Sequence, residues 1–186
     1  MTTLSIFDQS QPEHARTVTE SPPEIRELLA TRGIRFEQWP TRDLPADATE
    51  EQILEAYSEE VARLKEECGF QTADVVSLDP DNPRKEAFRQ KFLDEHTHSE
   101  DEVRFFVRGQ GLFYLHFGDE VYAIMCQKND LISVPDGTRH WFDMGPEPEF
   151  TCIRVFSNPE GWVADFTGED IANRLPRYEA LAEASG

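Results

Sequence analysis

Four residues of the sequence have the types and spacing of a metal site. His96 and His98 are separated by one residue, and Glu102 follows after three more. In an extended chain alternate side chains face the same way, so both imidazoles can reach one point, and a bend after His98 would bring the Glu102 carboxylate to it. A fourth candidate, His140, follows after residues 103–139, a separation that suits a few strands returning to the same wall. Three neutral imidazoles and one carboxylate suit divalent iron, nickel, manganese or zinc.

This ligand set predicts a site that can take part in a reaction. No cysteine lies near the four residues, which argues against a structural zinc site. An octahedral ion with four protein ligands keeps two adjacent positions that a bidentate substrate could fill. The alternative interpretation, four unrelated polar residues, suits a lone histidine better than it suits two histidine segments with this spacing.

The three cysteines, Cys68, Cys126 and Cys152, are far apart in the sequence and form no CxxC pair. Their number and spacing suggest neither a zinc ribbon nor a redox pair. They predict buried free thiols in a reducing compartment.

The net charge of the 186-residue chain is −19, from 18 basic and 37 acidic side chains. Phosphate binding needs a basic surface, so this charge argues against nucleic acids and anionic membranes as partners, and it favours a monomer. The first residues lack the basic and apolar segments of a signal peptide, and no apolar run approaches the about 18 residues of a membrane span. We therefore expect a cytoplasmic protein with one domain.

The elements that must position the four residues fall into two parts with different residue patterns. Before residue 94 the periodicity predicts alternating strands and helices. The predicted strands are 3–8, 34–39 and 73–79, and the predicted helices are 21–33, 47–69 and 82–92. From Glu102 on, short aromatic and β-branched runs separated by Gly, Asp and Asn predict an all-β sandwich or barrel. These runs are 102–109, 111–118, 120–130, 131–137, 139–145 and 149–158.

The sequence therefore predicts a mainly β fold with flanking helices (α+β). We expect a single domain over residues 1–186. Within it, residues 1–93 would form an N-terminal α+β layer, residues 94–165 a metal-binding β-barrel core, and residues 166–186 a C-terminal helix with a loose tail.

Two motifs of this sequence resemble those of the cupin superfamily, whose fold is a double-stranded β-helix (jelly-roll) barrel that binds a metal. "HTHSEDEVRFFVRG" reads H-x-H-x3-E-x6-G, and "PDGTRH" reads P-x-G-x2-H. The match departs at three turn or packing positions, where Gln90 and Asn129 replace glycines and Met144 replaces an asparagine. The resemblance implies that the barrel holds the ion through His96, His98, Glu102 and His140.

Within the cupins, the chain resembles the bacterial acireductone dioxygenase family. The resemblance covers roughly residues 1–180 and is densest from Lys91 to Gly168, including "DLISVPDGTRHWFDMG" and "RVFSNPEGWVADFTG". It implies one Fe2+ or Ni2+ per monomer and, as substrates, O2 and the acireductone 1,2-dihydroxy-3-keto-5-methylthiopentene of methionine salvage. With iron the family releases formate and 4-methylthio-2-oxobutanoate. With nickel it releases formate, carbon monoxide and 3-methylthiopropanoate.

Other residues have expected roles beside this ion. Arg104 lies two positions from Glu102 on the same face of a strand, where its guanidinium could hold the substrate as a dianion. Three aromatic side chains are candidates for the wall around the methylthio end, although core packing is the commoner fate of such residues. These are Phe92, Phe142 and Trp162.

Two acidic residues flank the ligands. In the family such neighbours of the ligands are proposed to assist metal incorporation, and the alternative is a solvated carboxylate. They are Glu95 and Asp101. We interpret the two remaining histidines, His14 and His116, as non-ligands, with His116 in the barrel wall.

Two other functions remain open at this point. The chain could be another metal-dependent cupin enzyme, such as an isomerase or a different dioxygenase, which would share the ligands but not Arg104 or the aromatic wall. It could also be a non-catalytic cupin that only binds a metal or ligand, although no basic helix pair for DNA binding accompanies the barrel.

Overall fold

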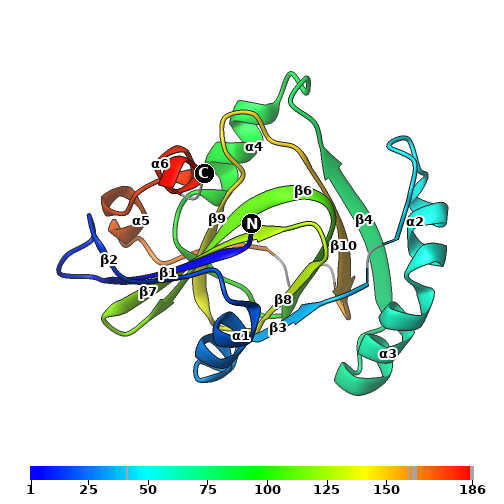
Figure 1. Ribbon diagram of the computed structural model, residues 1–186, viewed down its shortest axis with the longest axis horizontal. Helices are drawn as coiled ribbons and strands as arrows, with labels where there is room; N and C mark the ends of the chain where they lie inside the picture. Colours follow the sequence, from blue (N-terminus) through cyan, green and yellow to red (C-terminus); the bar gives the residue numbers. More distant parts are fainter. Residues whose placement is uncertain (41, 159, 161–162, 185–186) are drawn as a thin grey trace.

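The computed structural model describes residues 1–40, 42–158, 160 and 163–184, and a β-barrel fills its centre (Figure 1). Within these residues eleven strands form one antiparallel sheet system with the order β11-β5-β9-β6-β7-β1-β2, to which β10, β8, β4 and β3 are attached. The strands are β1 (Thr3–Asp8), β2 (Ala15–Thr19), β3 (Arg35–Gln38), β4 (Thr72–Leu78), β5 (His96–Thr97), β6 (Glu102–Phe117), β7 (Glu120–Gln127), β8 (Asp130–Val134), β9 (Arg139–Asp143), β10 (Phe150–Phe156) and β11 (Asp165–Phe166). The mainly β fold with flanking helices that the cupin resemblance implies is confirmed.

Strand β6 is the central element, because it belongs to both walls of the barrel. Its first half pairs with β8 and β10, and its second half pairs with β7 and β9. We expected two strands separated by glycines, whereas the structure has one strand of 16 residues with an irregularity opposite Thr151 and Cys152. There Gly109 has a φ of 73°, and a Cβ atom at this position would lie 1.8 Å from the Glu149 carbonyl oxygen. Only glycine fits this bend, so the chain continues through it as one strand.

The irregularity changes which residues of β6 face the barrel interior. Before it, Phe105 and Val107 lie in an outer cluster under the helices, and Phe106 lies in the inner cluster. After it, Phe113 lies inside and Tyr114 lies outside. The alternation of a regular strand is thus shifted by one residue, as expected for a bulge.

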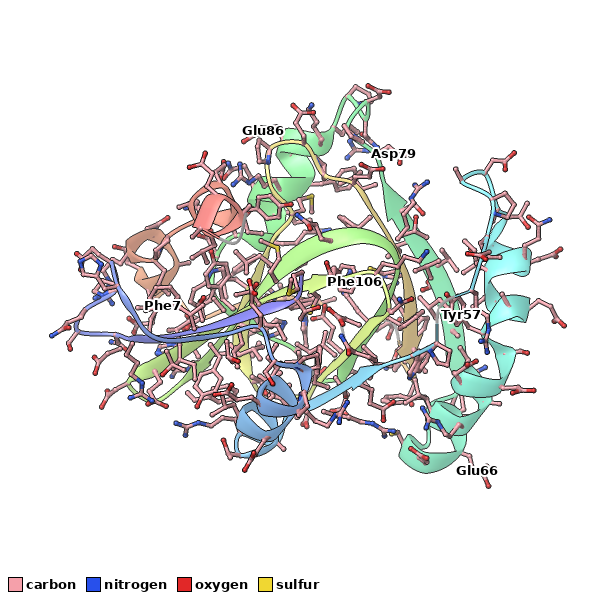
Figure 2. The ribbon with its side chains drawn as sticks, in the orientation of Figure 1. Phe7, Tyr57, Glu66, Asp79, Glu86 and Phe106 are labelled. Carbon is pink, nitrogen blue, oxygen red and sulfur yellow. The ribbon has the colours of Figure 1, made fainter. Side chains whose placement is uncertain are left out.

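Three apolar clusters hold the layers together. The first fills the barrel and contains Phe106, which lies in the middle of the molecule in Figure 2. The second joins the outer face of β4 and β10 to two helices through Tyr57. The third lies between the outer face of β1, β7 and β9 and the C-terminal helices and contains Phe7. The helices of the second and third clusters therefore cover outer faces of the barrel.

Helices flank the barrel on several sides (Figure 1). They are α1 (Pro22–Ala30), α2 (Glu50–Ala56), α3 (Ser58–Cys68), α4 (Lys85–Phe92), α5 (Ile171–Arg174) and α6 (Tyr178–Ala184). The single helix expected over 47–69 is wrong, because the backbone turns at Tyr57, where φ is −111° and ψ is 20°. Tyr57 is fully buried against Phe105 and Trp39, with ring centroids 4.8 Å and 6.3 Å away, so packing bends a segment whose periodicity predicts one helix.

The ends of the chain are more closely joined to the barrel than the expected layers suggest. Strands β1, β3 and β4 of the N-terminal segment pair directly with β7, β8 and β10. The tail expected to be loose contains α6, whose first residue donates its backbone N–H to Asp143 Oδ2 at 3.0 Å. No helix among the described residues is long and apolar enough to cross a membrane.

The cysteine prediction holds for two of the three residues. Cys126 and Cys152 are buried free thiols inside the barrel, but Cys68 is exposed at the end of α3. Its position on the predicted apolar stripe suggested burial, but it is the last residue of α3, and Gly69 after it turns the chain toward β4.

Candidate metal centre

Three imidazoles meet at one point inside the barrel. His96 lies on β5 and pairs in register with His140 on β9. Their ring centroids are 4.5 Å apart, and the ring of His98 lies 4.8 Å from each of them. One ligand nitrogen from each ring lies within 4.8 Å of the other two. Two residues that are 44 positions apart in sequence, His96 and His140, are thus joined by a single antiparallel pair, which places the three rings within reach of one ion (140 − 96 = 44).

Backbone carbonyls fix the orientation of two of the rings. His96 Nδ1 donates to the carbonyl of Asp94 at 2.8 Å, and His140 Nδ1 donates to the carbonyl of Thr138 at 2.7 Å. When the ring is neutral, each bond places its proton on Nδ1 and leaves Nε2 able to bind an ion, which is the usual arrangement of a metal-binding histidine. His98 Nδ1 is buried without a hydrogen-bond partner among the described residues.

The carboxylate of Glu102 lies against two of the imidazoles. Its Oε2 atom is 2.9 Å from His140 Nε2 and 3.2 Å from His98 Nε2, and its Oε1 atom accepts a 2.6 Å bond from Arg104 Nε. Glu102 and Arg104 face the same way because they are two residues apart on β6 before the bulge. The donor atoms that surround the centre are therefore three ring nitrogens and one carboxylate oxygen.

The pKa shifts follow from burial and from this contact. Burial lowers the pKa of His96 to about 4, with a smaller contribution from His140. Burial alone would raise the pKa of Glu102, but the charge of Arg104 and the hydrogen bonds from His140 and His98 hold it well below the ordinary value. For His140 the effect of burial is outweighed by the bond to Glu102, which raises its pKa. A neutral His96 and an ionised Glu102 are the protonation states that a cation requires.

These observations show that the residues present fit a divalent ion. The three rings are buried or nearly so, and two of them are held in the required tautomer. One buried ring nitrogen has no partner in the described part of the protein. A cluster of buried imidazoles beside an ionised carboxylate is costly unless a cation joins it.

A cavity of about 460 Å³ opens above the three histidines. It is lined by both basic and apolar residues. Its basic lining residues are Lys91, Arg104 and Arg154, and its apolar lining residues are Phe92, Phe142, Val163, Ala164 and Phe166. A small anion with an apolar tail would match such a lining.

Hydrogen bonds behind the ligands connect their segments. Glu95 is buried on the far side of His96, where it contacts His116 Nδ1 and accepts a 2.8 Å bond from Thr167 Oγ1. Asp101 Oδ1 accepts the backbone N–H of Asp136 at 2.9 Å, so it joins the loop after His98 to the turn before His140. Neither residue simply faces solvent as a solvated carboxylate.

The structure places most of the residues that the sequence analysis singled out. The four candidate ligands and Arg104 lie together, and Phe92 and Phe142 line the same cavity. Trp162 lies outside the described residues. His116 is buried and hydrogen-bonded away from the centre.

The sequence analysis missed two basic residues that line the cavity, Arg154 and Lys91. Arg154 pairs in register with Arg104 across β6 and β10, and its Nε donates to Asp74 Oδ1 at 2.8 Å. Lys91 comes from the last turn of α4. The pairing of β6 with β10 could have indicated Arg154, but the bulge between the strands hides that register from the sequence.

Comparison with known proteins gives a consistent result. The family described as ARD/ARD' family matches residues 3–164. An acireductone dioxygenase from Marinobacter nauticus is 79% identical over 98% of this chain and 98% of its own length, and one from Hahella chejuensis is 62% identical over 98% and 99%. Among solved structures, an acireductone dioxygenase from Bacillus anthracis with a cadmium ion in its active centre has a TM-score of 0.77 at 29% identity. The match covers 89% of this chain and 98% of that one.

Proposed function

Because the chain belongs to the ARD/ARD' family, we propose that the cavity above the three histidines is the active site of an acireductone dioxygenase that uses Fe2+ or Ni2+. The dioxygenase activity follows from relatives of that name at up to 79% identity over nearly the whole chain. The substrate of such an enzyme is an acireductone, and its reaction with O2 belongs to methionine salvage.

The single observation that carries the proposal is the convergence of His96, His98 and His140 beside an ionised Glu102, below a basic cavity. We propose these four residues as the ligands. When bound there, Fe2+ or Ni2+ would supply Lewis acidity toward the oxygens of the substrate. Neutral imidazoles and one carboxylate leave such an ion with a net charge of about +1, which attracts an anion.

The chain's own residues would bind and orient the substrate. Arg104 donates its Nε to Glu102, and the remaining donors of the same guanidinium can hold an enolate oxygen in its deprotonated form. Burial alone would lower the pKa of Arg104, but Glu102 outweighs it and raises that pKa, so the cation is permanent. Lys91 and Arg154 add positive charge to the cavity in a protein whose net charge is −19.

The apolar wall would bind the methylthio tail and keep water away from the reacting carbons. Phe142 is 6% exposed and follows His140 by two positions on β9, so it faces the same interior. Phe166 lies with its ring centroid 5.9 Å from that of His96. Tail and chelating oxygens would thus be held in one cavity.

The choice of metal decides the products, and one experiment tests both the metal content and the products. The purified protein should contain about one transition-metal ion per chain by elemental analysis. Metal-free protein reloaded with Fe2+ should consume O2 with the acireductone and form formate and the keto acid. With Ni2+ it should instead form formate, carbon monoxide and 3-methylthiopropanoate. Loaded protein that binds the acireductone without oxygen but consumes no O2 afterwards would contradict the proposal.

The other functions considered from the sequence are less well supported. A different cupin enzyme would not need a basic cavity beside an apolar wall, and a non-catalytic cupin would give no product by mass spectrometry. We also keep as proposals that the protein is a monomer in the cytoplasm. Light scattering and cell fractionation measure these two properties directly.

A further inference from the structure

Gly111 occupies a position in the barrel where its backbone does not require glycine. It lies on β6 beyond the bulge and is not among the glycines with positive φ. By strand geometry, any residue could adopt this conformation. The reason for glycine must therefore lie in the space around it.

That space is filled by the ring of Phe142. A Cβ atom at position 111 would lie 2.3 Å from Phe142 Cζ and 2.5 Å from Phe142 Cε2, while the next neighbour, Phe106 Cε1, is 3.5 Å away. The two close atoms are the far end of a side chain, so the ring and not the backbone would have to move.

Buried neighbours limit where the ring can move. Its centroid lies 4.8 Å from that of Phe113 and 5.8 Å from that of Phe150, and both neighbours are buried. The guanidinium of Arg104 lies 5.8 Å from the ring. The remaining side is the cavity that Phe142 lines. A methyl group at position 111 would therefore push the ring toward the place where a substrate tail lies.

We propose that Gly111 is a specificity-determining residue, because its missing side chain lets the Phe142 ring sit back and so sets the depth of the cavity for the substrate tail. The inference rests on the proposed function, since the tail is that of an acireductone. Gly111 itself touches no ligand and acts only through Phe142.

The test compares two substrates in holoenzyme with and without the extra methyl group. One substrate carries the methylthioethyl tail, and the other ends in a single methyl group. In Gly111→Ala, the ratio of kcat/KM for the long tail to that for the short tail should fall on the order of tenfold, as expected when a group the size of a methyl enters a binding pocket. Metal content should stay as in the wild type.

A second variant identifies the ring as the cause. Gly111→Ala with Phe142→Leu lacks the two clashing ring atoms, so its ratio of long-tail to short-tail kcat/KM should be higher than that of Gly111→Ala. Gly118→Ala is the matched control: φ is 60° there and no atom lies within 4 Å of the added Cβ, so it should cost stability without changing the substrate ratio.

The outcomes separate this inference from the function on which it rests. A metal-loaded Gly111→Ala protein with the wild-type ratio would overturn it, and so would a double variant whose ratio stays as low as that of Gly111→Ala. If wild-type protein consumes no O2 with either substrate, the proposed function fails and the inference fails with it.

Discussion

At the scale of single residues, the centre is held by groups that constrain one another. Glu102 contacts two imidazoles and Arg104, and backbone carbonyls orient two of the rings. Residues of such a cluster differ in what they contribute. A ligand nitrogen contributes to metal affinity, whereas Arg104 makes no bond to the ion and contributes charge to the cavity.

Replacing Arg104 should therefore lower turnover at unchanged metal content, whereas replacing His98 should lower the metal content itself. Arg104→Ala should lower kcat/KM about a hundredfold or more while the metal remains bound, because a preorganised cation is lost. His98→Ala should instead lose most of its metal. Arg104→Lys serves as the control, since it keeps the charge but not the fork-shaped donor set. Elemental analysis beside O2 uptake measures both effects, and full activity in Arg104→Ala would contradict the assigned role.

At the scale of elements, the bulge in β6 determines which residues share the interior. Arg104 and Gly111 are seven residues apart and would face opposite sides of a regular strand. The extra residue near Gly109 brings both to the inside, where one lines the cavity and the other makes room for Phe142. The bulge also lets one strand join both walls of the barrel.

A side chain at Gly109 should damage the barrel more than one at an open glycine. In Gly109→Ala the added Cβ meets the backbone of Glu149, in addition to a positive φ, and should lower the free energy of unfolding by about 3 kcal/mol or more. Gly69→Ala at the end of α3 has the same φ strain in open space and should lose about 1 kcal/mol. Urea denaturation measures the free energy of unfolding of both variants. Equal losses of stability would mean that the bulge is not tightly packed.

At the scale of the whole molecule, the C-terminal helix is tied to the two elements that border the cavity. Arg89 of α4 donates to Asp143 Oδ1 of β9 at 2.8 Å and to Glu179 Oε2 of α6 at 2.8 Å. Asp143 is fully buried and also accepts the backbone N–H of Gly145 and Tyr178. Helix α6 therefore rests on the segments that carry Phe92 and His140.

This connection should depend on pH through Glu179. The hydrogen bond from Arg89 holds the pKa of Glu179 below its ordinary value, against the opposing effect of burial. The stabilisation of α6 by the ionised Glu179 is therefore fully present above the ordinary carboxyl pKa. It is lost as the pH falls through the lowered pKa of Glu179. Because Glu179 is half-exposed, the effect should be modest and screened by salt.

Amide hydrogen exchange of residues 178–184 measures this dependence. Exchange should quicken in the wild type as the pH falls below about 4.5, after correction for the intrinsic rate. In Glu179→Gln, exchange should be faster at neutral pH and show little further change with acid. The same corrected acid response in both proteins would assign it to another carboxylate.

The sequence by itself determined the chemistry of the centre and the class of the fold. An H-x-H segment on an extended chain puts two imidazoles on one side, because strand side chains alternate, and the short β-branched runs predict a barrel. Both depend on local geometry, which neighbouring residues fix. The resemblance to acireductone dioxygenases depends on the same segments, and the comparisons confirm it.

Only the tertiary structure decided what surrounds the centre. The bulge in β6, the position of Arg154 opposite Arg104, the bend at Tyr57 and the tie of Glu179 to Arg89 all arise between residues far apart in the sequence. Local periodicity has no information on such pairs, since a single extra residue reverses every face that follows it. The ligands could therefore be predicted from their spacing, whereas the shape and charge of the cavity depended on how the strands meet.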